Sequence, residues 1–386
     1  MSAQRRNRPR GAGTAYKRAD GRWAAQIFVT ESGTNRRVRK TIYAKTRKEL
    51  EEKRTELISA EARREPIPPS KLTVAAYLEE WLEHLAKPRV RPTTFVAYRN
   101  YVEKYLVPGL GSKPVGRLSA REVRLYLDDL RRSGTGARTI QYLHATLRAA
   151  LEDAVREELI PKNVAKLVRV ARPERTERQP LSVEDVRTLL TKHDGHEIQP
   201  MLAVFALLGM RRSEVLGLKW EDVDLAAGSL KVRRGLQRVN GQLVDMQTKT
   251  ERSRRTVPLP AYVLELLRLQ ADQQAKWRVE AEGAFTETDY VFTTHVGTPI
   301  DPRNCTRVVQ NACKRAGVRV VRLHDFRHGC VSVLLDLGVP PRTAMEIVGH
   351  TTIEMTMNVY GHVSIDSMRS AMDQLGDLFQ GRGECK

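Results

Sequence analysis

The sequence predicts a multidomain protein that is mainly α-helical and carries small β-sheets. Its 386 residues exceed the length of a typical single domain. Two segments rich in proline or charge, 66–69 and 171–180, have the composition of linkers. The spacing of apolar residues is strand-like before the first linker and helical after it. We therefore expect a β-sheet plus helix domain at 1–64, a helical bundle at 72–170 and an α+β domain at 181–386.

The composition indicates a basic protein whose partner is a polyanion. The chain carries a formal net charge of +20, and its isoelectric point is about 10.0. Nucleic acid and an anionic membrane surface would both attract this charge. No apolar run approaches the roughly 20 residues of a membrane span, and the basic N-terminus leads into no apolar segment typical of a secretory signal. We therefore expect a nucleic-acid partner and no membrane.

The N-terminal domain is expected to form a small basic β-sheet. Residues 1–50 contain fourteen Lys or Arg and three Asp or Glu, a net charge of +11. Strand-like runs at 23–29 and 37–43 flank a Gly/Asn turn, and residues 46–49 have the capping-box spacing that starts a helix, here to about Ala62. A sheet with a basic face could lie in a DNA groove. The alternative is a basic surface that only meets solvent.

The middle domain is expected to be wholly helical. Apolar residues at helical spacing predict helices that begin near Thr73 and near Thr93. A third helix is expected at Ser119, where Ser-Ala-Arg-Glu has the spacing of a capping box. A long fourth helix should span Ala137 to Glu158. Four helices in a segment of this length predict a compact bundle.

The C-terminal domain is expected to mix helices with a few strands. Ser182-Val183-Glu184-Asp185 has the pattern of a helix cap, and the apolar run 201–208 predicts a buried helix. Three β-strands joined by turns should follow, and the first connection carries Asn240-Gly241, a common hairpin turn. These strands are expected at 229–235, 242–249 and 254–259.

The residues whose side chains could take part in a reaction are concentrated in this domain, around one tyrosine. Phosphoryl transfer needs in-line positioning and compensation of charge on the non-bridging oxygens. The motif segments are poor in the carboxylates that magnesium would require and rich in Arg, Lys and His. Guanidinium groups bind phosphate in bidentate fashion, a tyrosine needs a base or a cationic setting to attack, and a lysine could protonate a leaving 5′-oxygen. The residues that suit these tasks lie in five short segments: 209–214, 247–250, 323–328, 348–350 and 356–360.

These residues and their order resemble the tyrosine recombinases of the phage integrase family, in particular the integrases of actinobacterial phages and integrative plasmids. The resemblance rests on Gly-Met-Arg-Arg-Ser-Glu at 209–214, His-Asp-Phe-Arg at 324–327, Gly-His at 349–350 and a tyrosine ten residues later. It covers nearly the whole chain. It implies an arm-type DNA-binding domain, a helical core-binding (SAM-like) domain and a catalytic tyrosine-recombinase domain, in that order along the three predicted domains.

The resemblance assigns three residues to phosphate binding. Arg211 matches the first catalytic arginine of the family, and Arg327 matches the arginine of its H-x-x-R box. His350 matches the last phosphate-binding histidine. Three apolar positions depart from the family pattern by changes of similar volume, which we expect to have little effect. Leucine is usual at all three: Met210, Phe326 and Val348.

The resemblance assigns three further residues to proton transfer and attack. Lys249, in Thr-Lys-Thr, matches the β-hairpin lysine that acts as general acid, and Lys231 is a competitor for this role. His324 matches the histidine that assists proton transfer, and Tyr360 matches the nucleophile. His324 and His328 also have the spacing of zinc ligands. However, an aspartate follows His324 where the H-E-x-x-H motif needs glutamate, and no third ligand is evident.

The function implied is site-specific DNA recombination, which integrates or excises a mobile element at attachment sites through a 3′-phosphotyrosine. The implied partners are double-stranded DNA with core and arm sites and further copies of the chain in a homotetramer, with an excisionase and a host DNA-bending protein as candidates. No cofactor or metal is expected, because the phosphotyrosine conserves the energy of the broken bond. Four cysteines without a C-x-x-C pair fit a cytoplasmic location, with nucleoid association when DNA is bound.

Three other functions fit part of the sequence. A Xer-type resolvase shares the chemistry but generally lacks such an N-terminal extension. A type IB topoisomerase shares it too, but its relaxing activity needs no specific paired sites. A DNA-binding protein without catalysis would not need the full set of six residues. The integrase interpretation therefore leads.

Overall fold

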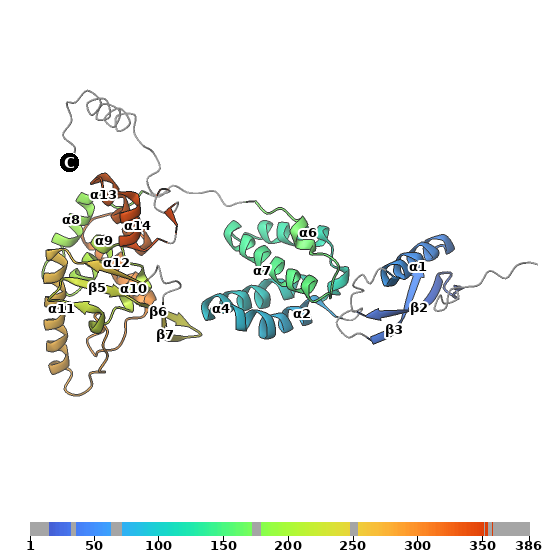
Figure 1. Cartoon of the computed structure of the whole chain (residues 1–386), viewed down its shortest axis with the longest axis horizontal. Coiled ribbons are helices and arrows are strands. Elements are labelled where there is room, and N and C mark those ends of the chain that lie inside the picture. Colours follow the sequence, from blue (N-terminus) through green and yellow to red (C-terminus); the bar gives the residue numbers. More distant parts are fainter. Residues whose placement is uncertain are drawn as a thin grey trace, which may run out of the picture. The chain divides into compact units, whose positions relative to one another are not determined.

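The computed structural model divides into two compact units, Met1–Arg175 and Thr176–Lys386 (Figure 1). None of the described helices combines the length and the apolar character that a bilayer span requires. The predicted linker at 66–69 and most of that at 171–180 lie outside the described residues. The structure describes residues 15–31, 36–62, 72–171, 179–247, 254–350, 352–353 and 357.

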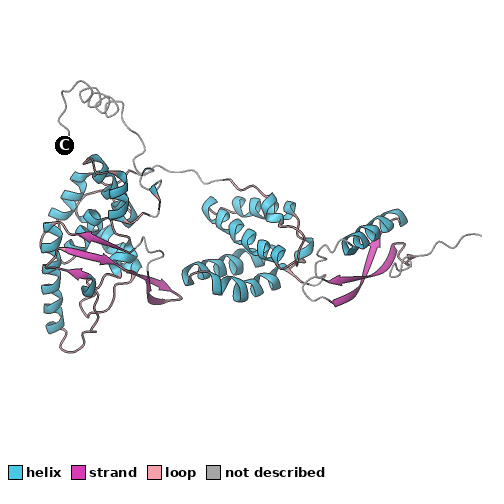
Figure 2. Cartoon of the chain, viewed as in Figure 1, coloured by secondary structure: helices cyan, strands magenta, loops and turns pink. Residues whose placement is uncertain are grey.

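The N-terminal part is a three-stranded antiparallel sheet with one helix on it (Figure 2). Its elements are β1 (Tyr16–Lys17), β2 (Trp23–Glu31), β3 (Arg36–Ala44) and α1 (Arg47–Ala62), in the sheet order β1-β2-β3. Alternate residues of β2 (Ala25, Ile27 and Val29) are buried, since α1 covers this face. Thr46 Oγ1 accepts a hydrogen bond from the Glu49 amide at 3.2 Å and caps α1. Both predicted strands and the predicted helix are confirmed.

The other face of this sheet carries aromatic rings and arginines at the surface. The register of β2 and β3 pairs Ala24 with Tyr43, Phe28 with Arg39 and Thr30 with Arg37, all on the face away from α1. Phe28 is 51% exposed. The Arg37 guanidinium lies 5.7 Å from the centre of its ring. This outer sheet face is therefore both cationic and aromatic.

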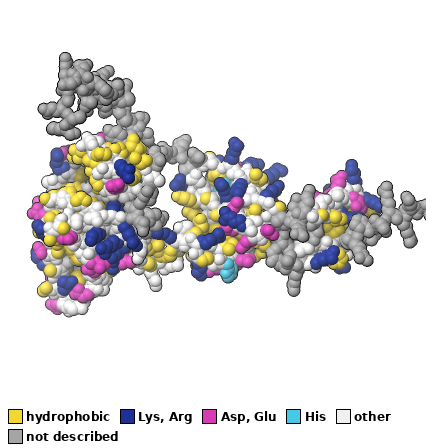
Figure 3. All heavy atoms as spheres, viewed as in Figure 1, with side chains coloured by type: hydrophobic (Ala, Val, Ile, Leu, Met, Phe, Trp, Pro, Cys, Tyr) yellow, Lys and Arg dark blue, Asp and Glu magenta, His cyan; other side chains and the backbone are white. Residues whose placement is uncertain are grey.

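The middle part is a helical bundle with its own hydrophobic core. Tyr77 donates through its hydroxyl to the Ala150 carbonyl at 2.6 Å, and Trp81 Nε1 donates to the buried Asp153 carboxylate at 2.7 Å. These bonds join the first helical segment to the last long helix. Figure 3 shows Lys and Arg side chains gathered on the visible face of the bundle. Its elements are α2 (Val74–Glu80), π-helical η1 (Trp81–Ala86), α3 (Lys87–Arg89), α4 (Pro92–Tyr101), π-helical η2 (Val102–Leu106), α5 (Val107–Leu110), 3-10 helix η3 (Val115–Arg117), α6 (Ala120–Arg132), α7 (Ala137–Arg156) and 3-10 helix η4 (Val164–Leu167).

The predicted helix starts in this bundle are confirmed. Thr73 caps α2 through its side chain, which accepts from the Ala76 amide. Ser119 and Glu122 form the predicted capping box of α6, with both reciprocal hydrogen bonds present. The π-helical segments η1 and η2, which the sequence pattern did not predict, interrupt the first two helical stretches without breaking them.

The C-terminal unit packs helices around α9 and sets two small sheets beside them. The strands β4, β5 and β8 form one antiparallel sheet, while β6 and β7 form a separate hairpin. Its elements are α8 (Val183–Thr191), α9 (Gln199–Leu208), α10 (Arg212–Leu216), 3-10 helix η5 (Trp220–Asp222), β4 (Val223–Asp224), β5 (Ser229–Val232), β6 (Arg234–Val239), β7 (Gln242–Gln247), β8 (Arg255–Pro258), α11 (Ala261–Glu280), α12 (Pro302–Arg315), α13 (Leu323–Asp336) and α14 (Pro341–Val348).

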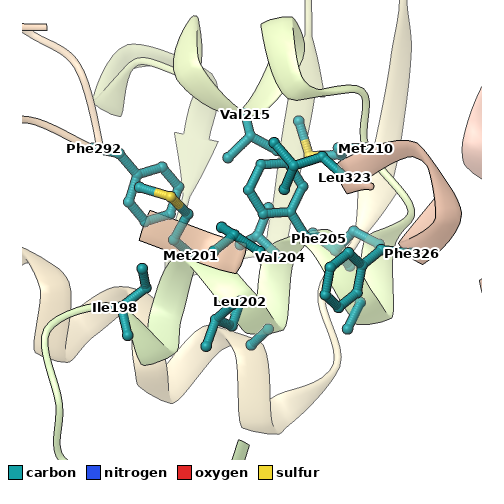
Figure 4. Close-up of a cluster of buried hydrophobic side chains, with 14 of the residues drawn as sticks. Ile198, Met201, Leu202, Val204, Phe205, Met210, Val215, Phe292, Leu323 and Phe326 are labelled. Atoms are coloured by element: carbon teal, nitrogen blue, oxygen red, sulfur yellow. The ribbon is translucent and has the colours of Figure 1, made fainter. Parts of the chain in front are cut away.

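Helix α9 is the centre of this unit, as the apolar run 201–208 predicts. All of its residues except Leu207 are buried. The Phe205 ring lies 6.4 Å from that of Phe326 on α13 (Figure 4). Helices α11 and α13 both pack against α9. Since α10 follows α9 directly, this core fixes the positions of both α10 and α13.

The strand predictions at 229–235 and 242–249 need one correction. A single strand was expected through residue 235, but the structure ends β5 at Val232 and starts β6 at Arg234. The break coincides with a change of sheet, because β5 pairs with β4 and β8 whereas β6 pairs with β7 and packs on α10. A Cβ added at Gly217 would lie 2.7 Å from the Leu236 amide nitrogen, so the two backbones touch where α10 ends. The Asn240-Gly241 turn, with φ of 48° and 82°, joins β6 to β7.

Candidate active site

The turn from α9 into α10 presents Arg211. Helix α9 ends at Gly209, whose φ of 55° is left-handed, and Arg211 is the residue that caps α10. A Cβ at Gly209 would lie 3.1 Å from the Cys330 sulfur on α13. Glycine is therefore required here for both the conformation and the close approach of the two helices.

Glu214 and a backbone carbonyl hold Arg211 in place. The Arg211 amide donates to Glu214 Oε2 at 3.0 Å, and its Nη1 donates to Oε1 at 2.7 Å. Arg211 Nη2 donates at 2.6 Å to the carbonyl of Gly349, which follows the end of α14. Burial alone would raise the pKa of Glu214, but the nearby Arg255 and Arg211 outweigh it and hold the pKa below its usual range. Glu214 thus fixes the orientation of the Arg211 side chain.

Arg327 is a buried cation with one donor group unused. Arg327 is only 1% exposed to solvent. Nη1 donates to the Gly209 carbonyl at 2.8 Å and Nε donates to His350 Nε2 at 3.2 Å. Nη2 is buried and has no hydrogen-bond partner in the described part of the chain. Burial lowers the pKa of Arg327 to about 9, and Arg211 contributes to the shift, so the group stays cationic at neutral pH.

The two histidines of the site are neutral at physiological pH. Burial lowers the pKa of His350 to about 3, with the positive charges of Arg327 and Arg211 acting in the same direction. Partial desolvation lowers the pKa of His324 to about 4, and His328, whose ring lies edge-on at 4.7 Å, adds to the effect. Because His350 Nε2 accepts from Arg327, we assign its ring proton to Nδ1.

The structure brings together four of the six predicted site residues. Arg211 contacts the residue before His350, Arg327 contacts His350 itself, and His324 stands one helical turn before Arg327 on α13. Lys249 and Tyr360 lie outside the described residues. The competitor Lys231 lies on β5, opposite Thr256 of β8.

The zinc alternative finds no support in the geometry of α13. Asp325, which follows His324, accepts from the Arg322 amide at 2.9 Å and forms the capping box of the helix. Among the described residues, no group of three or more His, Cys, Asp or Glu side chains is placed to hold a metal ion.

Arg255 is a buried arginine of the site that the sequence analysis did not single out. Its side chain is 7% exposed. Nη2 lies 3.1 Å from Glu214 Oε2, and Nε donates to the Ile347 carbonyl at 2.8 Å. A signal was present in the strand pattern: Arg255 is two residues before the buried Val257, on the same face of β8. An arginine on the inner face of a strand must have an anionic partner.

Comparison with known proteins places this architecture in a family. A profile described as the phage integrase family matches residues 179–366, and one described as phage integrase, N-terminal SAM-like domain, matches residues 73–131. Together the two matches span more than half of the chain. The chain belongs to the phage integrase family. It is therefore a tyrosine-type site-specific recombinase, as its sequence predicts.

Two relatives match this integrase-family chain over nearly its full length. The chain is 29% identical over 375 residues to a protein named "Tyrosine recombinase XerC-like" from Caldanaerobacter subterraneus subsp. tengcongensis, with 92% of this chain and 95% of the relative covered. It is 28% identical over 445 residues to an "Integrase" from Saccharopolyspora erythraea, which covers 99% of this chain and 100% of the relative.

Solved structures show the same fold at lower identity. The Tn1549 transposon integrase, in complex with transposon right end DNA, matches with a TM-score of 0.69 and 21% identity, over 79% of this chain and 100% of that one. A lambda integrase tetramer bound to a Holliday junction matches with a TM-score of 0.58 and 16% identity, over 93% and 99% of the two chains. The fold predicted from the sequence is thus confirmed.

Proposed function

We propose that this recombinase cuts DNA with Tyr360 as the nucleophile and holds the scissile phosphate with Arg211, Arg327 and His350. His324 and Lys249 serve proton transfer in this proposal. The observation that carries it is the state of Arg327. A buried guanidinium without a hydrogen-bonded carboxylate, and with Nη2 unused in the described chain, is completed by an anion. A phosphodiester oxygen supplies that anion.

The proposed reaction exchanges one phosphate ester for another. The Tyr360 oxygen attacks phosphorus, and its proton passes to a neutral base such as the His324 imidazole. The new bond from tyrosine oxygen to phosphorus replaces the bond to the 5′-oxygen, which takes a proton from Lys249 and leaves as a hydroxyl. The products are a 3′-phosphotyrosine and a free 5′-hydroxyl. Attack by a 5′-hydroxyl on the phosphotyrosine reverses these steps and rejoins the strand.

The electrostatic setting supports this assignment. The phosphorane carries extra negative charge on its non-bridging oxygens, and donors that are already in place stabilise such charge without reorganising. Arg211 is held by Glu214 and Gly349, and Arg327 by Gly209 and His350. The two guanidiniums therefore have fixed positions before DNA arrives.

The proposal extends to partners and location. The Tn1549 integrase structure contains transposon DNA and the lambda integrase structure is a tetramer on a Holliday junction, which supports DNA and a multimeric assembly as partners. We propose double-stranded DNA with core and arm sites, a homotetramer, and assistance from an excisionase and a host bending protein. In this proposal residues 1–64 bind arm sites, 72–170 bind the core site, and 181–386 carry the chemistry. A cytoplasmic location, on the nucleoid when DNA is bound, stays a prediction.

The test is trapping of the covalent intermediate. A labelled, nicked attachment-site DNA, taken from the sequence that flanks the gene, is incubated with the protein in EDTA and separated on a denaturing gel. Wild type should give a protein–DNA adduct and Tyr360→Phe should give none, while both bind the DNA equally in a gel-shift assay. Tight binding by wild type without any adduct would contradict the proposal and favour a DNA-binding protein that does no chemistry.

A further inference from the structure

Arg255 completes a closed chain of contacts that includes Arg211, the first arginine proposed to bind phosphate. Arg211 Nη1 bonds Glu214 Oε1, and Glu214 Oε2 lies 3.1 Å from Arg255 Nη2. Arg255 Nε in turn donates to the Ile347 carbonyl, and Arg211 Nη2 donates to the Gly349 carbonyl. This chain of contacts therefore passes from α10 through β8 to the end of α14 and back to α10.

Packing at Gly349 tightens the same chain of contacts. Gly349 has a φ of 71°, which ends α14 in a left-handed turn directly before His350. A Cβ added there would lie 2.7 Å from Arg255 Nη1. The Arg255 guanidinium thus lies against the backbone of the turn that presents both the Gly349 carbonyl and His350.

Charge explains why an arginine is needed at this position. Glu214 is 4% exposed and faces two guanidiniums, one from Arg211 and one from Arg255. With a single partner, its second oxygen would keep only the hydrogen bond from the Arg211 amide. The carboxylate could then turn, and the Arg211 side chain, which is 30% exposed, would turn with it. Arg255 itself is too buried to be a surface DNA contact.

We propose that Arg255 is a positioning residue. Through Glu214 it sets the orientation of the Arg211 side chain, and through the Ile347 carbonyl it sets the position of the turn that carries His350. The inference rests on the proposed function, since it assigns Arg255 to the same phosphate site. It predicts that Arg255 acts on the rate of cleavage and not on the affinity for DNA. It also predicts that a lysine cannot replace it fully, because one ammonium cannot bond Glu214 and Ile347 in the two directions that a guanidinium reaches.

The first test compares Arg255→Gln and Arg255→Lys with wild type and with Arg254→Gln. Arg254 is the matched control, because it is the neighbouring residue, loses the same charge, is exposed and bonds Gln247. Adduct formation is measured in single turnover at saturating protein, alongside Kd. Arg255→Gln should cleave about 10- to 100-fold more slowly and Arg255→Lys should fall between it and wild type, with Kd changed less than about threefold. Arg254→Gln should cleave at the wild-type rate. Equal rates for Arg255→Gln and Arg254→Gln would overturn the inference.

A double-mutant cycle separates positioning from a general structural role. Arg211→Ala leaves only the His350 turn for Arg255 to position, so Arg255→Gln should slow the Arg211→Ala variant by a clearly smaller factor than it slows wild type. Independent effects that multiply would overturn the inference. Arg255→Lys, which keeps the charge next to Glu214, provides a second cycle should Arg255→Gln fail to fold.

A sulfur leaving group tests which part of the site Arg255 serves. In DNA whose 5′-bridging oxygen is replaced by sulfur, the leaving thiolate needs little protonation, so defects in the proton donor are relieved. The Arg255→Gln defect should persist on this DNA. Full recovery would assign Arg255 to the proton donor and contradict the inference. Wild type on the same DNA must form an adduct, and its failure to do so would count against the proposed function and not against Arg255.

Discussion

The N-terminal sheet and the catalytic site both depend on arginines, but they use them in opposite ways. On the sheet, Arg18 and Arg22 are 41% and 56% exposed and lie over the Tyr43 ring. In the catalytic site, Arg255 and Arg327 are buried, and carbonyls, a carboxylate and an imidazole hold them. The first arrangement keeps the cations at the surface, where water hydrates them and Asp20 pairs with both. The second fixes them before a ligand arrives.

This difference indicates a division of work. Exposed cations attract phosphates through a field that salt screens, and they release counterions when DNA binds. Buried cations are costly to place and are screened little, but they stabilise charge that develops in a transition state. We therefore expect changes at the sheet to alter affinity and its salt dependence, and changes at the buried cluster to alter rate.

The largest effect should come from removing one of the two arginines that we propose bind the scissile phosphate. Arg211→Ala and Arg327→Ala should each lower the single-turnover cleavage rate by about 100-fold or more, the scale of losing one oxyanion donor. Rates are measured as adduct formation at saturating protein, and circular dichroism controls for folding. A rate within a few-fold of wild type would remove that arginine from the phosphate site.

A smaller effect is expected from removing the basic N-terminal domain. A chain without residues 1–64 should bind DNA with arm sites about tenfold or more weakly, and the slope of log K against log salt should become shallower, because fewer counterions are released. Nicking of an isolated core site should continue at the rate of the full chain. Unchanged affinity for arm sites would show that this domain has another role.

The smallest effect should be a pH dependence of stability that stems from His350. Its pKa is lowered to about 3 in the folded state by burial and by Arg327, against 6.5 for the ordinary group. The unfolded chain therefore takes up a proton below about pH 6.5 that the folded chain does not, so the free energy of unfolding falls as pH falls. Between pH 7.5 and 5.5 this contribution should be about 1 kcal/mol. Denaturant titrations at these two pH values give the free energy of unfolding of wild type and of His350→Gln. The decrease between pH 7.5 and 5.5 should be larger in wild type by that amount. Equal decreases in the two proteins would contradict the burial of His350.

Much of the fold could be predicted because local signals are strong in this chain. Capping boxes at Ser119 and Ser182 mark helix starts, and the apolar run of α9 marks the core. The break between β5 and β6 could not be predicted from local pattern. The chain leaves one sheet for another there, since β5 pairs with β4 and β8 whereas β6 pairs with β7, and such pairing is a tertiary effect.

The site shows the same limit. Arg211, His324, Arg327 and His350 could be named from motif and resemblance, and the structure brings them together. Arg255 could not, because its role depends on partners in two distant segments, Glu214 and Ile347. Strand alternation indicates that its side chain points inward, but not what it meets there.

The most direct test of this division of work measures the cleavage rate and the affinity for DNA of two variants, one at a buried arginine and one at an exposed arginine. Arg327→Ala and Arg37→Ala are compared with wild type, with Kd from binding to DNA that carries core and arm sites and the cleavage rate from single turnover at saturating protein. We predict that Arg327→Ala lowers the rate by about 100-fold with little change in Kd, and that Arg37→Ala raises Kd a few-fold with the wild-type rate. An Arg37→Ala protein that cleaves as slowly as Arg327→Ala when saturated with DNA would contradict the account.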